Sequence, residues 1–264
     1  MKLSFICHWN DHKILEKYLL ASVFTRKGDE LILLSESPSQ AIAYAEGERL
    51  AHNEILVFIH QDIITSRKWR DGLESQISLI TKKDPKWGVI GVLGYYFDKD
   101  SNWRCAGQGE TTNYMWSHQV YRLPLKVDWI DGMICVKRKG VLAFDTNIPK
   151  FHGVMEDLCE QSKVAKRGIW VANLYTKHYS PELNRNHGDV TMCANYIIKK
   201  WDKLVPVGAV IFWPRDKKYF IRNLGQIMPL ETLMEASKDG LSYHVTKRQV
   251  PLEKVQKLYL GKVG

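Results

Sequence analysis

The sequence contains few of the residues that mark disulfide-stabilised or repetitive proteins. Its 264 residues include only 5 cysteines, 9 prolines and 18 glycines. The cysteine number is odd, the spacing is wide and no CxxC pair occurs, so neither a disulfide framework nor a zinc knuckle is expected. Low-complexity and collagen-like classes are excluded by the small glycine and proline content. Disorder as the main state is excluded by a hydrophobic content of 45%.

Long apolar runs are also missing. No stretch approaches the roughly 18 apolar residues of a membrane-spanning helix. The opening segment MKLSFICHWNDH has an apolar run that is too short for a secretory signal. The longest candidate, WGVIGVLGYYF at 87–97, is predicted to be a buried strand. We therefore expect a cytoplasmic protein.

Several catalytic fingerprints are absent from the chain. No GxGxxG follows the first predicted strand and no GxxxxGK[ST] exists, so a dinucleotide fingerprint and a phosphate loop are excluded. HExxH and GxSxG are also lacking. The regularly spaced glycines of GVIGVLG lie within an apolar strand, where they indicate close packing.

Positive charge is concentrated at the C-terminal end. The net charge is +9, but residues 1–198 hold 25 basic and 23 acidic side chains, whereas residues 199–264 hold 13 and 6. A nucleic-acid footprint over the whole chain is therefore not expected. A polyanionic partner, if there is one, should bind residues 199–264, and a membrane surface or acidic acceptor is favoured over nucleic acid.

The first hundred residues alternate between strand and helix patterns. Continuous apolar runs that end in polar residues predict strands, and amphipathic stretches between them predict helices. The predicted strands are 3–9, 30–37 and 54–63, and the predicted helices are 12–22 and 38–53. Such alternation with fully apolar strands is typical of a mostly parallel α/β sheet covered by helices on both faces.

Beyond residue 64 the alternation is less regular. We expect helices at 67–85, 154–168 and 194–206, with shorter helical patterns at 230–238 and 251–260. Single continuous strands are predicted for 87–97, for 126–140 and for 169–180. Residues 98–125 are predicted to be irregular or a hairpin, since they show no clear periodicity.

Polar residues follow each of the first three predicted strands. They are His8, Asn10 and Asp11 after the first, Ser35 and Glu36 after the second, and His60, Gln61 and Asp62 after the third. Ligands of a doubly wound sheet bind at the carboxyl ends of its strands. Asp62 could hold a hard divalent cation there, but capping of the following helix is an equally good interpretation.

Two further groups carry titratable side chains. Glu156 and Asp157 are adjacent acids near the start of a predicted helix, where the helix dipole alone favours acids. Adjacent helical residues point about 100° apart, so only one of them should face a site. His178 ends the last predicted strand and His187 follows nine residues later.

The order and spacing of several motifs resemble the glycosyltransferase-2-like enzymes of the GT-A fold, in particular their streptomycin-biosynthesis-type branch. The resemblance covers about residues 2–206 and rests on Asn10-Asp11 followed by the segments AYAEG, VFIHQDI, WGVIGVLG, WIDGMICVKR, FHGVMEDLC, KHYS, KKW and LVP. It implies a GT-A fold with a Rossmann-like nucleotide-binding half at 1–97, an acceptor half at 98–206 and a basic C-terminal extension at 207–264.

The resemblance also implies roles for individual residues. His60-Gln61-Asp62 stands at the metal motif, with Asp62 as ligand of Mn²⁺ or Mg²⁺ and His60 in place of the usual first acid. His178 matches the histidine that completes the metal or diphosphate site. Asp157 matches the catalytic base, with Glu156 as the weaker candidate. The remaining donor-binding residues implied are Cys7, Asn10, Asp11, Glu36, Asp131 and Gly132. Ala45 departs from the pattern, because relatives often carry Asn there.

These roles imply an inverting, metal-dependent glycosyltransferase of the hexosyl or pentosyl type. Its donor would be a UDP, GDP or dTDP sugar, and its acceptor a hydroxyl of a glycan, a lipid-linked molecule or a small molecule, as in polysaccharide biosynthesis. The alternatives are a non-catalytic nucleotide- or carbohydrate-binding module, a retaining transferase and a sugar nucleotidyltransferase. The basic extension could bind a membrane surface peripherally, whereas helix packing on the domain is the simpler interpretation.

Overall fold

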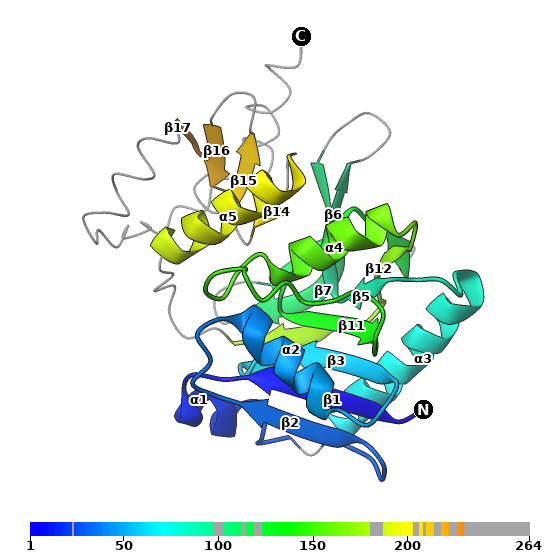
Figure 1. Ribbon diagram of the computed structural model, residues 1–264. Helices are drawn as coiled ribbons and strands as arrows, with labels where there is room; N and C mark the ends of the chain where they lie inside the picture. Colours follow the sequence, from blue (N-terminus) through cyan, green and yellow to red (C-terminus); the bar gives the residue numbers. More distant parts are fainter. Residues whose placement is uncertain are drawn as a thin grey trace.

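The computed structural model describes most of the first 202 residues. The described ranges are 1–22, 24–97, 103–111, 115–118, 123–179 and 187–202, together with four strands between 206 and 229. Two β-sheets share the main body, and helices pack on both faces of the larger one (Figure 1). This arrangement confirms the α/β fold class predicted from the sequence.

The larger sheet has seven strands in the order β2-β1-β3-β11-β5-β12-β9. Five of them run in one direction, and only β9 and β11 run in the opposite direction. The strands are β1 (Leu3–His8), β2 (Glu30–Leu34), β3 (Ile55–Ile59), β5 (Val89–Gly91), β9 (Leu125–Lys126), β11 (Ile134–Arg138) and β12 (Ile169–Val171). The carboxyl ends of β1 and β3 lie side by side, because these strands pair in parallel from Leu3↔Ile55 to Ile6↔Phe58.

Alternation along the central strands divides the core into two clusters. In β3, Leu56 and Phe58 belong to one cluster, while Val57 and Ile59 belong to the other. Side chains that alternate between faces and are apolar on both faces require helices on each side. Accordingly, α2 and α4 supply residues to the first cluster and α3 to the second (Figure 1).

The helices begin where the sequence offers capping groups. Ser39 and Ser66 accept hydrogen bonds from the first turns of α2 and α3, and Asp11 does the same for α1. Gly153 precedes α4 with a φ of 82°, a conformation that favours glycine. The helices are α1 (His12–Lys17), α2 (Gln40–Leu50), α3 (Arg67–Lys83), α4 (Val154–Val164) and α5 (His187–Trp201).

The second sheet has six strands. Three of them, β6, β10 and β13, lie within the ranges 87–97, 126–140 and 169–180 that were each predicted as a single strand. The path of this sheet is β10-β6-β7-β13-β4, and β8 pairs with β7. The members are β4 (Ile63–Ile64), β6 (Leu93–Phe97), β7 (Trp103–Thr111), β8 (Met115–His118), β10 (Trp129–Ile130) and β13 (Thr176–His178). The antiparallel pair β7–β8 is the hairpin expected within residues 98–125.

The predictions of single strands at 87–97, 126–140 and 169–180 were wrong. Each range contains two or three strands that belong to different sheets, for example β5 and β6 within 87–97. The chain passes from one sheet to the other at glycines that closely approach side chains of neighbouring strands. A Cβ atom at Gly91 would lie 2.7 Å from Cβ of Ile130, and one at Gly94 would lie 2.6 Å from a methyl of Val171. The glycines of this segment therefore serve packing, as predicted.

The last described elements are β14 (Pro206–Val207), β15 (Val210–Trp213), β16 (Lys218–Ile221) and β17 (Gln226–Pro229), which form an antiparallel sheet. The sequence pattern did not predict these strands. The helices predicted at 230–238 and 251–260 lie outside the described residues. Within the described part, no helix combines the length and apolar character needed to cross a bilayer.

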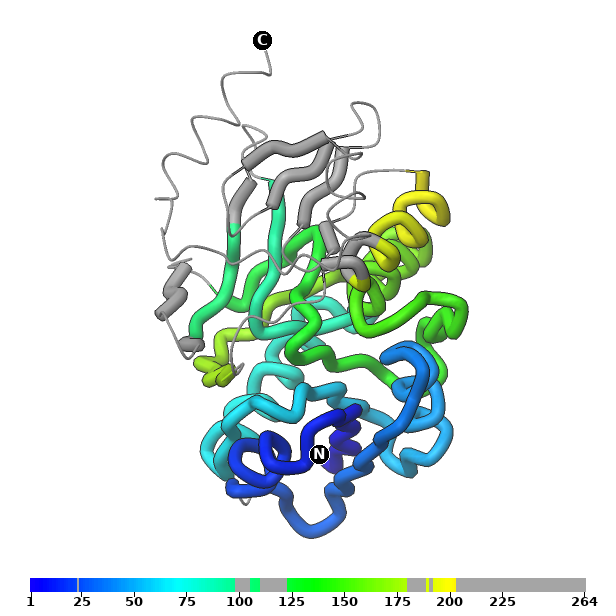
Figure 2. The backbone as a smooth tube through the Cα atoms, turned by 90° about the vertical axis from the view of Figure 1, so that its left-hand side faces the viewer, coloured from blue at the N-terminus to red at the C-terminus, as the bar shows by residue number. Residues whose placement is uncertain are grey.

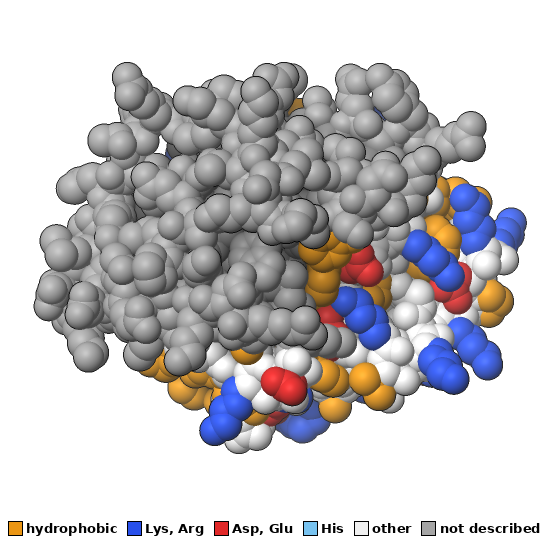
Figure 3. Space-filling view, turned by 90° about the horizontal axis from the view of Figure 1, so that it is seen from above, with side chains coloured by type: hydrophobic (Ala, Val, Ile, Leu, Met, Phe, Trp, Pro, Cys, Tyr) orange, Lys and Arg blue, Asp and Glu red, His pale blue; other side chains and the backbone are white. Residues whose placement is uncertain are grey.

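The described surface does not present one sign of charge in the view from above. Lys and Arg side chains there are interspersed with acidic and hydrophobic ones (Figure 3). Interspersed charges of both signs are ordinary for a protein surface.

Candidate functional site

Gln61 joins the ends of β1 and β3. Its Oε1 accepts hydrogen bonds from the backbone N–H groups of Asn10 and Asp11, both at 3.1 Å, and its Nε2 donates to Oδ1 of Asn10 at 2.6 Å. Three predicted donor-binding residues are therefore held together at one sheet edge. Asp11 also caps α1, accepting from the N–H groups of Lys13 and Ile14.

A cluster of His60, Asp62 and His178 lies at the same edge. One potential ligand atom from each residue lies within 4.8 Å of the others. Oδ1 of Asp62 is 3.0 Å from Nε2 of His178, and the two imidazole centroids are 5.8 Å apart. His178 is brought there by β13, which pairs antiparallel with β4 so that His178 lies opposite Ile63.

Burial and mutual charge set the ionisation of this cluster. Burial would raise the pKa of Asp62, but the hydrogen bond and charge of His178 outweigh it and hold that pKa below its ordinary value. Burial lowers the pKa of His60 against the opposing charge of Asp62, and nearby His178 lowers it further. A charged carboxylate beside a neutral imidazole is the state in which both groups can bind a metal ion.

Asp131 and Gly132 lie beside this cluster. The carboxylate of Asp131 accepts from Tyr95 Oη at 3.1 Å and from the N–H of Met133 at 3.1 Å. A Cβ atom at Gly132 would lie 4.0 Å from Nε2 of His60. Asp131 and Gly132, which the resemblance implies as donor-binding residues, are thus adjacent to the predicted metal motif.

Cys7 is fully buried near the same place. Burial, and then the negative charge of Asp62, raise the pKa of its thiol. Its Sγ lies 3.7 Å from the carbonyl oxygen of His8. Burial thus favours the neutral thiol of Cys7 beneath the site, and the five cysteines, all of which lie in the described part, form no disulfide.

Sequence reasoning missed Gln40, which lies beside His60, and Tyr44, which contacts Gln40. Nε2 of Gln40 is 3.4 Å from Nε2 of His60 and 3.0 Å from Oη of buried Tyr44. His8, named only as a strand-end residue, stacks on Phe151 with centroids 5.4 Å apart, and burial together with the charge of His60 lowers its pKa. Gln40 could have been noticed because a polar residue opens α2 directly after its Ser cap.

Asp157 is enclosed by α4 and α5 with only 1% of its surface exposed. Its Oδ1 accepts from Nε1 of Trp201 at 2.8 Å and lies 2.8 Å from Nζ of Lys200. Its Oδ2 accepts from Nε2 of Gln161 at 2.7 Å. In the described part, no hydrogen bond or ion pair links Asp157 to the histidine cluster.

Glu156, Glu36 and His187 lie elsewhere. Glu156 is 7% exposed in the first turn of α4, and its charge raises the pKa of Cys159 and Cys193. Glu36 is exposed after β2 with a φ of 56°, and no described contact joins it to the other candidates. His187 begins α5, and its side chain lies outside the described residues.

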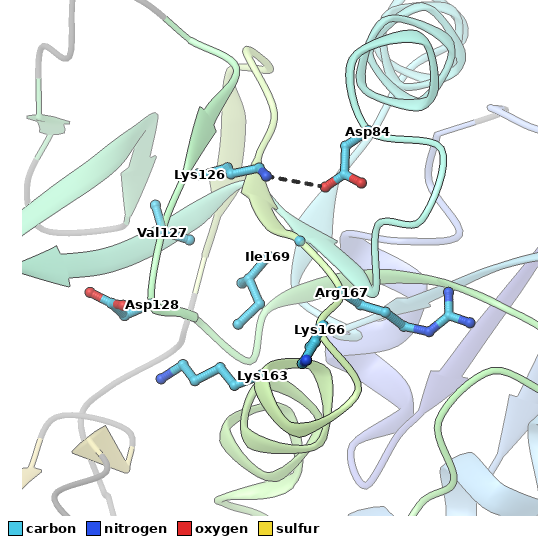
Figure 4. Close-up of a pocket in the computed structure, with 9 residues that line it drawn as sticks. Asp84, Lys126, Val127, Asp128, Lys163, Lys166, Arg167 and Ile169 are labelled. Atoms are coloured by element: carbon cyan, nitrogen blue, oxygen red, sulfur yellow. Dashed lines mark ion pairs between the residues drawn. The ribbon is translucent and has the colours of Figure 1, made fainter.

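A separate hollow of about 310 Å³ lies at the opposite end of the strands, where β12 begins (Figure 4). Lys126, Lys163, Lys166 and Arg167 line it, and Lys126 pairs with Asp84 at 3.6 Å. Three of these cations come from the last turn of α4 or just after it, where the helix dipole favours positive charge. Helix stabilisation is sufficient to explain them.

The donor atoms of the histidine cluster fit a divalent transition-metal ion. His60, Asp62 and His178 offer two imidazole nitrogens and one carboxylate oxygen within a small volume. Imidazole ligands suit Fe²⁺ and Zn²⁺, the carboxylate also suits Mn²⁺, and Mg²⁺ prefers oxygen ligands and water throughout. Three protein ligands would leave coordination positions open for a bound substrate.

The chain belongs to a family of proteins described as "Glycosyltransferase like family", whose model matches residues 4–179. This range contains β1 to β13 and therefore the whole histidine cluster. The larger mixed sheet with its helices matches GT-A glycosyltransferases in architecture.

The individual relatives are distant. A structure of GalNAc-T7 with UDP, GalNAc and Mn²⁺ has a TM-score of 0.50 and 10% identity, covering 76% of this chain and 50% of the other. A structure of Staphylococcus aureus TarS 1–349 has a TM-score of 0.47 and 12% identity, covering 76% and 65%. The protein "ATP synthase subunits region ORF 6" of Fuscovulum blasticum is 24% identical over 132 residues. The alignment covers 47% of this chain and 51% of that protein, so the chain spans about half the length of the curated relative.

Proposed function

We propose that the protein is an inverting, metal-dependent glycosyltransferase that uses a nucleotide-diphosphate sugar. The observation that carries the proposal is the cluster of His60, Asp62 and His178 at the carboxyl ends of β1 and β3 in a chain of the glycosyltransferase-like family. Ligands of such sheets bind at this edge. Gln61 and Asn10, which are joined by a hydrogen bond, lie beside the cluster, where donor-binding residues are expected.

The cluster would hold Mn²⁺ or Mg²⁺, although two imidazole nitrogens are less typical ligands of Mg²⁺. When bound, the ion neutralises negative charge on the leaving diphosphate. The chain's own contribution is to orient the ligands: Asp62 pairs with His178, and Gln40 lies beside Nε2 of His60. Ligands whose orientation is fixed by neighbours bind a metal more tightly.

Asp157 is the proposed general base, and Glu156 is the alternative. A base removes the proton of the acceptor hydroxyl as its oxygen attacks the anomeric carbon, which contributes about 10²–10⁴-fold to the rate. One displacement inverts the anomeric configuration, so no covalent nucleophile is needed. The hydrogen bonds from Gln161 and Trp201 would fix the orientation of the Asp157 carboxylate.

The donor is proposed to be a UDP, GDP or dTDP sugar. The structural neighbour with a TM-score of 0.50 contains UDP, GalNAc and Mn²⁺, which supports this class of donor. Cys7, Asn10, Asp11, Glu36, Asp131 and Gly132 remain predicted donor-binding residues. The acceptor is proposed to be a glycan or lipid-linked hydroxyl in polysaccharide biosynthesis in the cytoplasm. Peripheral membrane contact through residues 207–264 is part of this proposal.

Nucleoside diphosphate release tests the proposal. The protein is incubated with UDP, GDP and dTDP sugars and Mn²⁺, with and without chelator, and Asp157→Asn serves as the base variant. Release that requires metal and falls at least about 10²-fold in Asp157→Asn supports it. Undiminished release by Asp157→Asn would contradict the base assignment. The anomeric configuration of the product, measured by NMR, separates an inverting from a retaining enzyme.

A non-catalytic nucleotide- or carbohydrate-binding module is the second candidate. The observation that favours it is the enclosure of Asp157, since both of its oxygens already accept hydrogen bonds from the protein. Such a module would bind a nucleotide sugar with Mn²⁺ and release no diphosphate. Binding by thermal shift without any turnover would therefore favour the module over the enzyme.

A further inference from the structure

Lys200 is placed between two carboxylates that lie far apart in the sequence. Its Nζ is 2.7 Å from Oδ2 of Asp145 and 2.8 Å from Oδ1 of Asp157. The side chain of Lys200 is 29% exposed, that of Asp145 15% and that of Asp157 1%. Charge interactions are screened least at such partly buried sites. One ammonium group therefore interacts strongly with two negative charges.

Asp145 is itself fixed by its surroundings. Oδ1 accepts from the N–H and Nδ2 of Asn147 at 3.0 and 3.1 Å, and Oδ2 accepts from Oη of Tyr196 at 2.8 Å. Burial would raise the pKa of Asp145, but the hydrogen bonds of Lys200 and Tyr196 outweigh it and lower that pKa to about 2. Asp145 thus stays charged at neutral pH and holds Lys200 in place.

Among the described residues, the side-chain partners of Asp157 that lie outside α4 come from the last turn of α5. Lys200 and Trp201 contact its Oδ1 directly, and Tyr196 reaches the same place through Asp145. In Figure 2, α5 (yellow) runs beside α4 (yellow-green), and the two helices pack together in the structure. The position of α5 therefore determines the surroundings of Asp157.

We propose that Lys200 is a positioning residue that holds the Asp157 carboxylate in place through the bridge Asp145–Lys200–Asp157. The catalytic consequence rests on the proposed function, in which Asp157 is the general base. The bridge itself does not depend on that function. A carboxylate that faces a fixed ammonium keeps its negative charge to lower pH than one that faces another carboxylate alone.

In the described part of the chain, the groups that face Asp157 are few enough to name. From α5 they are Lys200, Trp201 and Tyr196, and from the loop before α4 the charged group is Asp145. On α4 itself, neutral Gln161 donates to Oδ2. Hydrogen bonds to Asp145 and Asp157 outweigh burial and raise the pKa of Lys200, so it is an ammonium group throughout the pH range of interest.

The indole N–H of Trp201 provides a direct readout, because it donates to Oδ1 of Asp157. The ¹H–¹⁵N signal of this indole is assigned with Trp201→Phe and followed from pH 8 to pH 3 in the full-length protein. Lys200→Met removes the ammonium, Lys200→Arg retains a positive charge, and Lys199→Met is the matched control. Lys199 is an exposed neighbour on the same helix.

Lys200→Met should move the titration midpoint of the Trp201 signal upward by about one to three pH units, because Asp145 and Asp157 then face each other without a cation between them. Lys200→Arg and Lys199→Met should titrate like the wild type. Identical midpoints in all four proteins would overturn the proposal. If Lys200→Met does not fold, Lys200→Gln is used with the same criteria.

Transfer kinetics then separate this proposal from the proposed function. If Lys200→Met shifts the acid limb of the pH–rate profile upward and lowers kcat more than it raises the donor KM, both proposals hold. If the Trp201 midpoint shifts while Asp157→Asn retains full turnover, the bridge is real but Asp157 is not the base. If Asp157→Asn is inactive and the Lys200→Met midpoint is unchanged, only the positioning role is wrong.

Discussion

At Asp62, burial and charge act in opposite directions, and charge prevails. Only 8% of its surface is exposed, yet the hydrogen bond from His178 keeps its pKa below the ordinary value. A charged carboxylate in this position is costly without a cation nearby. The partly buried pair with His178 offsets that cost, and a bound metal would offset it further.

Removal of the Asp62 charge should abolish tight metal binding. Asp62→Asn leaves two imidazoles without an anionic ligand, so we expect Mn²⁺ affinity to fall at least about 10-fold. Isothermal titration with Mn²⁺ measures it, and Glu54→Gln, which changes an exposed acid, is the control. Equal affinity in Asp62→Asn and wild type would show that the cluster is not the metal site.

At the scale of elements, Glu30 connects the start of β2 to the loop before β3. It accepts hydrogen bonds from Ser4 and from the N–H groups of His52 and Asn53. Burial would raise the pKa of Glu30, but the hydrogen bonds lower it to about 2, against an ordinary value of 4.5. A carboxyl with a lowered folded-state pKa stabilises the fold above about pH 4.5, and this contribution is lost as pH falls toward 2.

Glu30→Gln should therefore destabilise the protein at pH 6 and hardly at all near pH 2. With allowance for solvent screening, we expect a loss of about 1–2 kcal/mol in the free energy of unfolding at pH 6. Urea unfolding at both pH values measures the difference. A loss that is the same at pH 6 and pH 2 would contradict this account of Glu30.

Gly168 shows how closely the elements beyond α4 approach α3. A Cβ atom at this position would overlap the carboxylate of Asp84, which already accepts from Nε1 of Trp170 at 2.9 Å. Gly168→Ala should cost about 1–3 kcal/mol, since an extra methyl in a packed site forces neighbours to shift. Gly132→Ala, with open space around the new methyl, should cost much less. Thermal unfolding compares the two, and equal losses would argue against steric overlap.

Local patterns predicted the first half of the fold well, because the information lies within each segment. Apolar runs that end in polar residues located β1, β2 and β3, and the amphipathic stretches between them located α1 and α2. The exchange of strands between sheets depends on contacts over long sequence distances, such as β10 pairing with β6. No local pattern encodes such pairing, so 126–140 was read as one strand.

The candidate site, too, could be predicted from the sequence only in part. His60, Gln61 and Asp62 could be found from their position after β3. The role of His178 came from the family resemblance, and its nearness to Asp62 requires the pairing of β13 with β4. Gln40 and Lys200 were missed, because only tertiary packing brings them to His60 and Asp157.

At the scale of the whole molecule, the proposed function gives net charge little part in donor binding. The candidate site would bind an anionic donor through local groups, because the +9 charge derives largely from residues 199–264. Donor binding should therefore depend on metal more than on ionic strength. A thermal-shift titration with UDP, GDP and dTDP should raise Tm only in the presence of Mn²⁺, by mass action. A rise that persists in chelator, or that vanishes in moderate salt with Mn²⁺ present, would contradict this view.

The most direct test of the central claim is nucleoside diphosphate release from a panel of UDP, GDP and dTDP sugars. Wild-type protein, Asp62→Asn and the control Glu54→Gln are compared with Mn²⁺. We predict that wild type and Glu54→Gln release diphosphate from at least one donor, and that Asp62→Asn and chelated wild type do not. Release by Asp62→Asn at the wild-type rate, or no release and no binding with any donor, would contradict a metal-dependent glycosyltransferase at this site.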